Sequence, residues 1–87
     1  MRLLVLYKQN SEQARPVEEF MREFTRRSGK EIEVIDPDTR EGANLAEIHD
    51  VVRYPAILAL ADDGQSLNMW QGEELPLLDE VSSYINL

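Results

Sequence analysis

One proline opens an apolar run near the middle of the chain, and this run limits the folds that the sequence can adopt. Residues 55–61 read Pro-Ala-Ile-Leu-Ala-Leu-Ala, and Asp62-Asp63-Gly64 follows them. Proline is tolerated at the first residue of a strand, whereas within a strand it would remove a ladder hydrogen bond. The Asp-Asp-Gly sequence is typical of a turn, and large apolar residues appear again after it. The sequence therefore predicts a β-hairpin with strands at 56–61 and 66–71.

The part of the chain before this hairpin predicts a strand, a helix and a second strand. Residues 3–6 form a continuous apolar run, as expected of a central strand that is covered on both faces. Apolar residues then recur at helical spacing, with Gly29 as the expected C-terminal cap. They are Val17, Phe20, Met21 and Phe24. Residues 32–35 predict the second strand. Because parallel strands joined by a helix need a crossover connection, residues 3–36 are predicted to form one βαβ unit.

Two more helices complete the predicted order. Asp38 or Thr39 is expected to cap a helix with an apolar face formed by Leu45, Ile48 and Val52. The last helix is expected after Gly72, with Pro76 in its first turn. One side of this helix would consist of Leu75, Leu78, Val81, Ser82 and Ile85. The resulting order is β-α-β-α-β-β-α, and a chain of 87 residues is long enough for one small domain, residues 1–87.

The absence of cysteine excludes several kinds of chemistry. The sequence contains no cysteine and one histidine, His49, so disulfides, thiolate nucleophiles, cysteine–zinc sites and polyhistidine metal sites cannot form. The segment Asp36-Pro37-Asp38 lacks the other ligands of a calcium loop and is better explained as a turn and helix cap. We therefore expect no metal site and no cofactor.

The charge distribution restricts the partners. The net charge is −8, all nine Lys and Arg residues lie in 1–53, and residues 54–87 carry six acids. Such a surface repels phosphate, so nucleic acid is not expected as a partner. No apolar run approaches the roughly 18 residues of a membrane span. The apolar run at residues 3–6 is also too short for a signal peptide. We expect a cytoplasmic protein with no membrane partner.

The segment from Val52 to Gly64 resembles a pattern of the thioredoxin/glutaredoxin superfamily. In thioredoxins an apolar residue and an arginine precede the proline of this strand, and a glycine follows it. Here the sequence reads Val52-Arg53-Tyr54-Pro55-Ala56, and Trp70-Gln71-Gly72 matches the stretch after the hairpin. The resemblance implies a minimal thioredoxin-like α/β fold, in which a four-stranded mixed sheet of order 2-1-3-4 is flanked by three helices. It also implies a cis bond between Tyr54 and Pro55.

The second signature of that superfamily is missing. Its Cys-x-x-Cys motif follows the first strand, and this position holds Ser11-Glu12-Gln13-Ala14, so Ser11 and Ala14 replace the two cysteines. A serine hydroxyl is barely ionised at neutral pH and forms no disulfide, so it cannot replace the attacking thiolate. The chain is therefore expected to be redox-inactive, without thiol-disulfide oxidoreductase activity.

A domain with this fold and without thiols can still bind a protein or an extended peptide. The resemblance implies that the residue before the cis-proline offers its backbone to such a segment, and the start of the first helix can accept a carbonyl or an anion. The expected peptide-binding groove contains Asn10, Ser11, Gln13, Arg53, Tyr54, Pro55 and Gly72. Ser11 can also be explained as an ordinary helix cap.

Two other possibilities follow from the sequence. The domain resembles the N-terminal domain of glutathione transferases, in which a Tyr or Ser near the end of the first strand stabilises a thiolate. Tyr7 and Ser11 lie in that region, so the resemblance implies a glutathione-binding or glutathione-transferase-like domain that uses these two residues as the alternative function. However, Gly72 lacks the hydroxyl of the matching glutathione-holding position. Separately, strand 66–71 is expected at a sheet edge, so the chain could form a homodimer by pairing across this edge.

Overall fold

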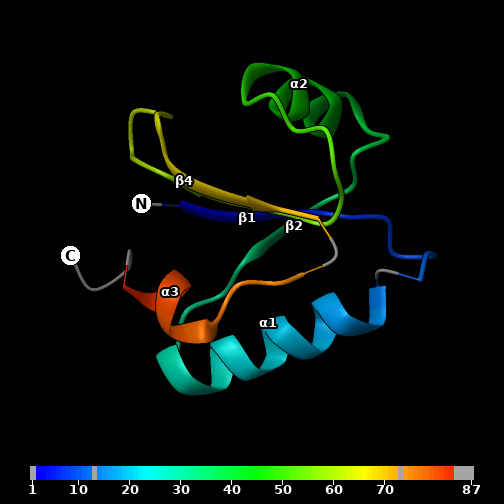
Figure 1. The fold of residues 1–87 in the computed structure, drawn as a ribbon. Coiled ribbons are helices and arrows are strands. Elements are labelled where there is room, and N and C mark those ends of the chain that lie inside the picture. Colours follow the sequence, from blue (N-terminus) through cyan, green and yellow to red (C-terminus); the bar gives the residue numbers. More distant parts are fainter. Residues whose placement is uncertain (1, 13, 73, 84–87) are drawn as a thin grey trace.

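The computed structural model describes residues 2–12, 14–72 and 74–83. These residues form four strands and three helices in the predicted order β-α-β-α-β-β-α (Figure 1). The strands are β1 (Arg2–Leu6), β2 (Glu33–Ile35), β3 (Ala56–Leu60) and β4 (Ser66–Gln71). The helices are α1 (Ala14–Ser28), α2 (Arg40–Ile48) and α3 (Leu78–Ser82).

The four strands form one mixed sheet with the order β2-β1-β3-β4. Strand β1 is parallel to β2 and antiparallel to β3, and β3 is antiparallel to β4. The parallel pair is connected through α1, as the βαβ prediction requires. The predicted fold class and the 2-1-3-4 strand order are therefore confirmed.

The sheet separates two apolar layers. Helices α1 and α3 cover one face and α2 covers the other (Figure 1). Because successive residues of a strand point to opposite faces, Leu3 and Val5 pack toward α1 and α3, while Leu4 and Leu6 pack toward α2. All five residues of β3 are buried, so this strand and β1 form the centre of the core. Among the described residues, no helix has both the length and the apolar character that a membrane span requires.

The predicted apolar face of α2 is partly wrong. Leu45 packs against the core, but Ile48 is 71% exposed and Val52 is 78% exposed. The helix ends at Ile48, and Asp50 then takes a positive φ of 56°, which turns the chain away from the helix axis. As a result Ala46 and Val51 occupy the core positions that the sequence predicts for Ile48 and Val52.

The last helix begins later than predicted. Helix α3 begins at Leu78, so Pro76 precedes it and does not lie in its first turn. Val81 is fully buried against the α1 layer, and Leu75 and Leu78 pack beside it. The expected contribution of Ile85 lies outside the described residues.

Candidate functional site

Three loops meet at one end of the sheet. Strands β1 and β4 are both antiparallel to β3, so the chain leaves β1 and β4 at the end where it enters β3. Figure 1 shows this arrangement, with the segments after β1 and β4 at the same end of the sheet as the connection into β3. The loop after β1, the segment 49–55 and the segment after β4 therefore surround this end.

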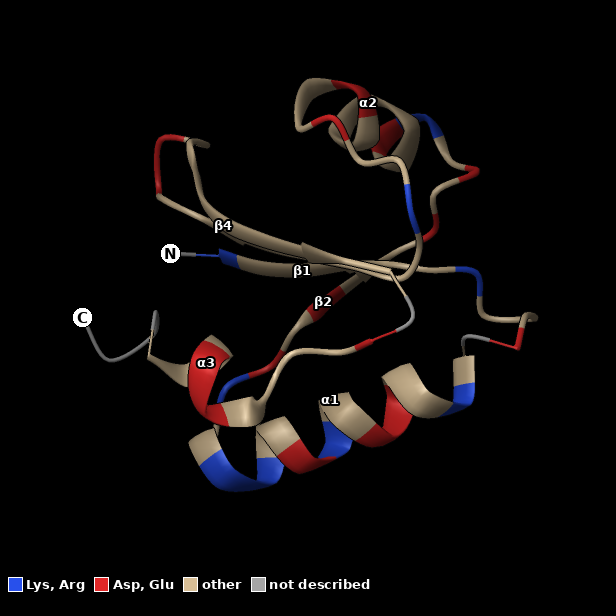
Figure 2. Ribbon diagram, viewed as in Figure 1, with Lys and Arg blue, Asp and Glu red and all other residues tan. Residues whose placement is uncertain are grey.

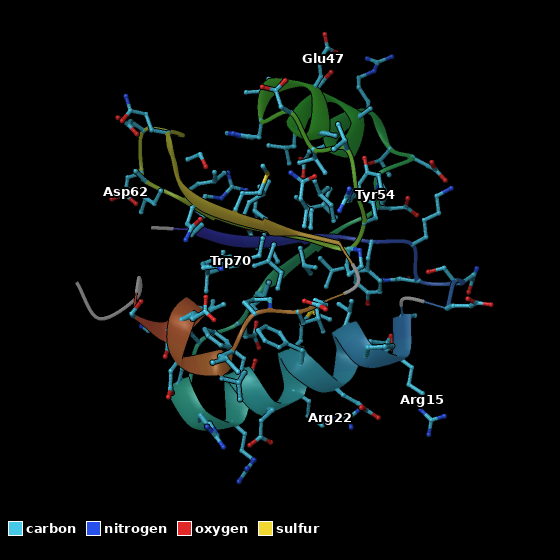
Figure 3. All side chains as sticks on the ribbon, in the orientation of Figure 1. Arg15, Arg22, Glu47, Tyr54, Asp62 and Trp70 are labelled. Carbon is cyan, nitrogen blue, oxygen red and sulfur yellow. The ribbon has the colours of Figure 1, made fainter. Side chains whose placement is uncertain are left out.

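The segment before β3 turns sharply at its proline. The peptide bond between Tyr54 and Pro55 is cis. Pro55 is buried, while the half-buried Tyr54 packs against the apolar layer beneath α2. Figure 3 shows Tyr54 on the α2 side of the sheet. Arg53 is exposed beside it.

The end of β4 fixes the main chain that precedes the proline. The Oε1 atom of Gln71 accepts hydrogen bonds from the backbone N–H groups of Val52 (2.8 Å) and Arg53 (3.0 Å). One residue later, the N–H of Gly72 donates to the carbonyl oxygen of Pro55 at 3.0 Å. The segment 52–55 is therefore attached to β4 on both sides of Tyr54.

A depression of about 590 Å³ lies next to this attachment and is lined by residues from both sides of it. The lining residues are Arg53, Tyr54, Gln71, Gly72 and Glu74. Gly72 has a φ of 108°, a conformation that suits glycine and few other residues. Arg53 and Glu74 are exposed and bring charges of both signs to the depression.

Comparison with known proteins identifies the fold. Thioredoxin 1 of Thermosipho africanus has a similar structure, with a TM-score of 0.66 and 15% sequence identity over 99% of this chain and 91% of that chain. A malarial protein matches with a TM-score of 0.63 and 17% identity over 97% of this chain and 91% of that chain. The chain has a thioredoxin-like fold. No protein-family model and no curated protein matches the sequence.

The positions of the missing cysteines lie at the start of α1 in this thioredoxin-like fold. Ala14 is the first residue of α1, and its N–H donates to the carbonyl oxygen of Ser11 at 3.1 Å. The Ser11 hydroxyl donates to the carbonyl oxygen of Lys8 at 2.6 Å. The Lys8 ammonium lies 3.3 Å from the Asp38 carboxylate, which connects this loop to the turn before α2. No atom here can perform thiol chemistry.

The structure brings together part of the predicted groove. Arg53, Tyr54, Pro55 and Gly72 are joined by the contacts of the Gln71 side chain and the Gly72 amide. The exposed Asn10 and the half-buried Ser11 belong to the loop after β1 and do not line the depression formed by the described residues. Gln13 lies outside the described residues.

The predicted peptide-binding groove did not include two residues that line the depression, Gln71 and Glu74. Gln71 ends a strand that has no charged side chain, and nothing in its sequence neighbourhood distinguishes an amide that binds backbone N–H groups from an exposed one. Glu74 is two residues beyond Gly72, so its position depends on how the chain leaves β4.

Tyr7 is a core residue of the thioredoxin-like fold. It is 2% exposed and packs in the layer beneath α1 and α3. Its hydroxyl donates to the Glu18 carboxylate at 3.5 Å. Burial raises the pKa of the Tyr7 phenol above its usual value, and the negative charge of Glu18 and the hydrogen bond to it act in the same direction. The phenol is thus directed toward α1, and its ionisation is disfavoured.

The described residues contain no group of three or more His, Asp or Glu side chains that could hold a metal ion. In the turn before α2, the Asp36 carboxylate accepts a hydrogen bond from the Asp38 N–H at 2.8 Å. The Thr39 hydroxyl caps α2 by accepting from the Gly42 N–H at 3.0 Å. His49 is the half-buried C-cap of α2. These acids and this histidine therefore have structural roles.

Proposed function

We propose that this domain binds an extended segment of a partner protein at the depression beside Tyr54 and Pro55, without redox chemistry. The observation that carries the proposal is the double attachment of segment 52–55 to β4 through the Gln71 side chain and the Gly72 amide. Main chain that is already fixed loses little conformational freedom when a partner binds to it. An extended segment gains main-chain hydrogen bonds from such a surface and specificity from side-chain contacts.

The charges around the depression indicate which kind of segment would bind. Arg53 and Glu74 lie on its lining, so a segment with one acidic and one basic residue would pair with both side chains. The chain has no cysteine, so a bound disulfide or thiol of the partner would not be exchanged. We propose that this binding takes place in the cytoplasm, the compartment that the sequence predicts.

An NMR titration with a set of extended peptides tests the proposal. We expect amide shift changes concentrated at Arg53, Tyr54 and Gly72. The Gln71→Leu variant removes the acceptor for two backbone N–H groups and should weaken binding by about tenfold, equivalent to about 1.4 kcal/mol. Gln65→Leu alters an exposed glutamine of the hairpin turn and is the matched control, with unchanged affinity expected.

Two results would contradict the proposal. Peptides that produce no shifts at these residues would exclude the groove, and equal binding by Gln71→Leu and the unaltered protein would exclude the role of the attachment. A parallel titration with glutathione tests the alternative function. Shifts at Ser11, Tyr54 and Gly72 with glutathione alone would favour that alternative.

A further inference from the structure

Strand β4 is an uncharged edge of the described sheet. Residues 65–72 contain no Asp, Glu, Lys or Arg, and also no proline. The opposite edge, β2, has only three residues and includes Glu33, which forms an ion pair with Arg2 at 3.0 Å. Proteins commonly protect sheet edges from pairing with other chains by short strands, charges or proline. Here β2 has the first two protections and β4 has none of the three.

The register shows which main-chain groups of β4 point outward. The hydrogen bond from Gly72 N–H to the Pro55 carbonyl marks residues 55 and 72 as a hydrogen-bonded pair. Bonded and non-bonded pairs alternate along an antiparallel ladder, so Trp70 bonds to β3 while Met69 and Gln71 belong to non-bonded pairs. The N–H and C=O groups of Met69 and Gln71 are consequently directed away from β3, toward the open edge.

We propose that a second copy of this chain pairs antiparallel with β4, with Met69 opposite Gln71 of the second copy. The same two residues then serve both chains, because a two-fold interface uses one surface patch twice. Each Met69–Gln71 pair exchanges two main-chain hydrogen bonds. Trp70 lies on the two-fold axis in a non-bonded pair, where the two Cα atoms are about 4.5 Å apart.

The charge pattern makes the edge of β4 the place where a second copy meets the least repulsion. Each chain carries a net charge of −8, so two copies repel, and this repulsion is weakest where no charged side chain lies at the contact, as along residues 65–72. The acids of the hairpin turn, Asp62 and Asp63, lie beyond the paired residues at the tip of the hairpin (Figure 2). In an antiparallel pair these tips point to opposite ends of the dimer.

Two features of β4 limit the strength of this pairing. A register shift between Ala59 and Leu60 interrupts the ladder near the hairpin turn, so regular pairing is confined to residues 68–71. In addition, the Asn68 side-chain oxygen accepts a hydrogen bond from the Met69 N–H at 2.7 Å and competes with the second copy for this donor. A contact of four residues is smaller than a standard stable interface, so the dimer should be weak and concentration-dependent.

Sedimentation at increasing protein concentration tests the proposal. We expect the full chain to shift from monomer toward dimer as concentration rises. Asn68→Ala releases the Met69 N–H and should increase the association constant several-fold. Met69→Pro removes the outward N–H without removing a β3–β4 hydrogen bond, and should abolish association. Val34→Lys puts a charge on the opposite edge and is the control, with association unchanged.

A second readout keeps the test independent of the stability of Met69→Pro. Trp70 is the only tryptophan, so dimer formation should change its fluorescence with the same concentration dependence as sedimentation. Added salt should strengthen association, because it screens repulsion between two acidic chains. The proposal would be overturned if the protein stayed monomeric at all concentrations or if salt weakened the association. It would also be overturned if Val34→Lys changed the association and Asn68→Ala did not. The pairing uses the main chain of Gln71, whereas the proposed peptide site uses its side chain, so failure of peptide binding does not affect this interface.

Discussion

At Gly42, α2 passes so close to the preceding turn that no side chain fits. A Cβ atom on this residue would lie 2.1 Å from the Asp36 carbonyl oxygen and 2.8 Å from the Pro37 Cα. The same Asp36 oxygen accepts hydrogen bonds from the N–H and the hydroxyl of Thr39, so the turn cannot move without loss of the helix cap. The sequence did not reveal this constraint, because Gly42 stands in an ordinary helical segment.

Gly42→Ala should therefore destabilise the protein although alanine favours helices. Helix propensity alone predicts a gain of about 1 kcal/mol, whereas overpacking against main chain costs about 1–3 kcal/mol or more. We expect a net loss in the free energy of unfolding, measured by urea denaturation. Asn44→Ala changes an exposed residue of the same helix and should be neutral or slightly stabilising. A stabilised Gly42→Ala variant would show that the turn can move away.

The Tyr7 phenol makes stability depend on alkaline pH. Because burial raises its pKa in the folded state above the usual value near 10, the unfolded chain loses this proton first as pH rises. The unfolded state then binds fewer protons than the folded state, so the free energy of unfolding must fall with increasing pH above about 10. Tyr7→Phe cannot ionise and should show a smaller decrease in urea titrations from pH 9 to 11. Equal slopes for both proteins would contradict the assignment.

Among the elements, α2 shows where the sequence was sufficient and where it was not. Thr39 was identified as a possible cap and does cap the helix, because capping depends on neighbouring residues. The prediction that Ile48 and Val52 face the core was wrong, because the helix ends before a residue with positive φ. That residue is Asp50, whereas glycine is the usual sequence signal for this conformation.

The strand order could be predicted for a related reason. Apolar periodicity and turn residues are local signals, and the crossover rule restricts the ways in which β1 and β2 can be joined. The double attachment at Gln71 could not be predicted. It joins residues 19 positions apart in the chain, and its geometry depends on the packed sheet.

The end of α2 gives a prediction at the scale of this element. Asp50 N–H donates to the Glu47 carbonyl and Val51 N–H donates to the Ala46 carbonyl at 2.8 Å, with Asp50 in the left-handed conformation between them. This is the arrangement in which glycine is usual. Asp50→Gly should raise the free energy of unfolding by up to about 1 kcal/mol, and Asp50→Val should lower it by about 1–2 kcal/mol. Equal stabilities in thermal and urea unfolding would argue against a left-handed residue here.

At the scale of the whole molecule, the acidic charge is not distributed evenly. The Cα positions extend over 30 × 30 × 18 Å, and the Debye length at 0.01 M salt is about 30 Å, so at low salt every charge interacts with the others. Basic residues alternate with acids along α1, whereas the hairpin tip and α3 carry acids alone (Figure 2). On α1, a hydrogen bond from Arg26 holds the pKa of Glu23 below its usual value, and Arg27 also pairs with this carboxylate.

Two charge reversals separate the effect of net charge from that of local position. Glu47→Lys and Glu23→Lys each change the net charge of −8 by two positive charges. Glu47 lies in the last turn of α2, where the helix has no basic residue, so lysine there interacts favourably with the helix dipole. Glu23→Lys instead places a third cation beside Arg26 and Arg27 and removes their shared partner.

In thermal unfolding at 0.01 M salt, we expect Glu47→Lys to raise the midpoint temperature and Glu23→Lys to lower it. The difference between the two variants should be smaller at 0.5 M salt, because screening weakens both effects. If both variants were stabilised to the same extent, long-range repulsion between the acids would outweigh the local pairs, and net charge alone would determine this part of the stability.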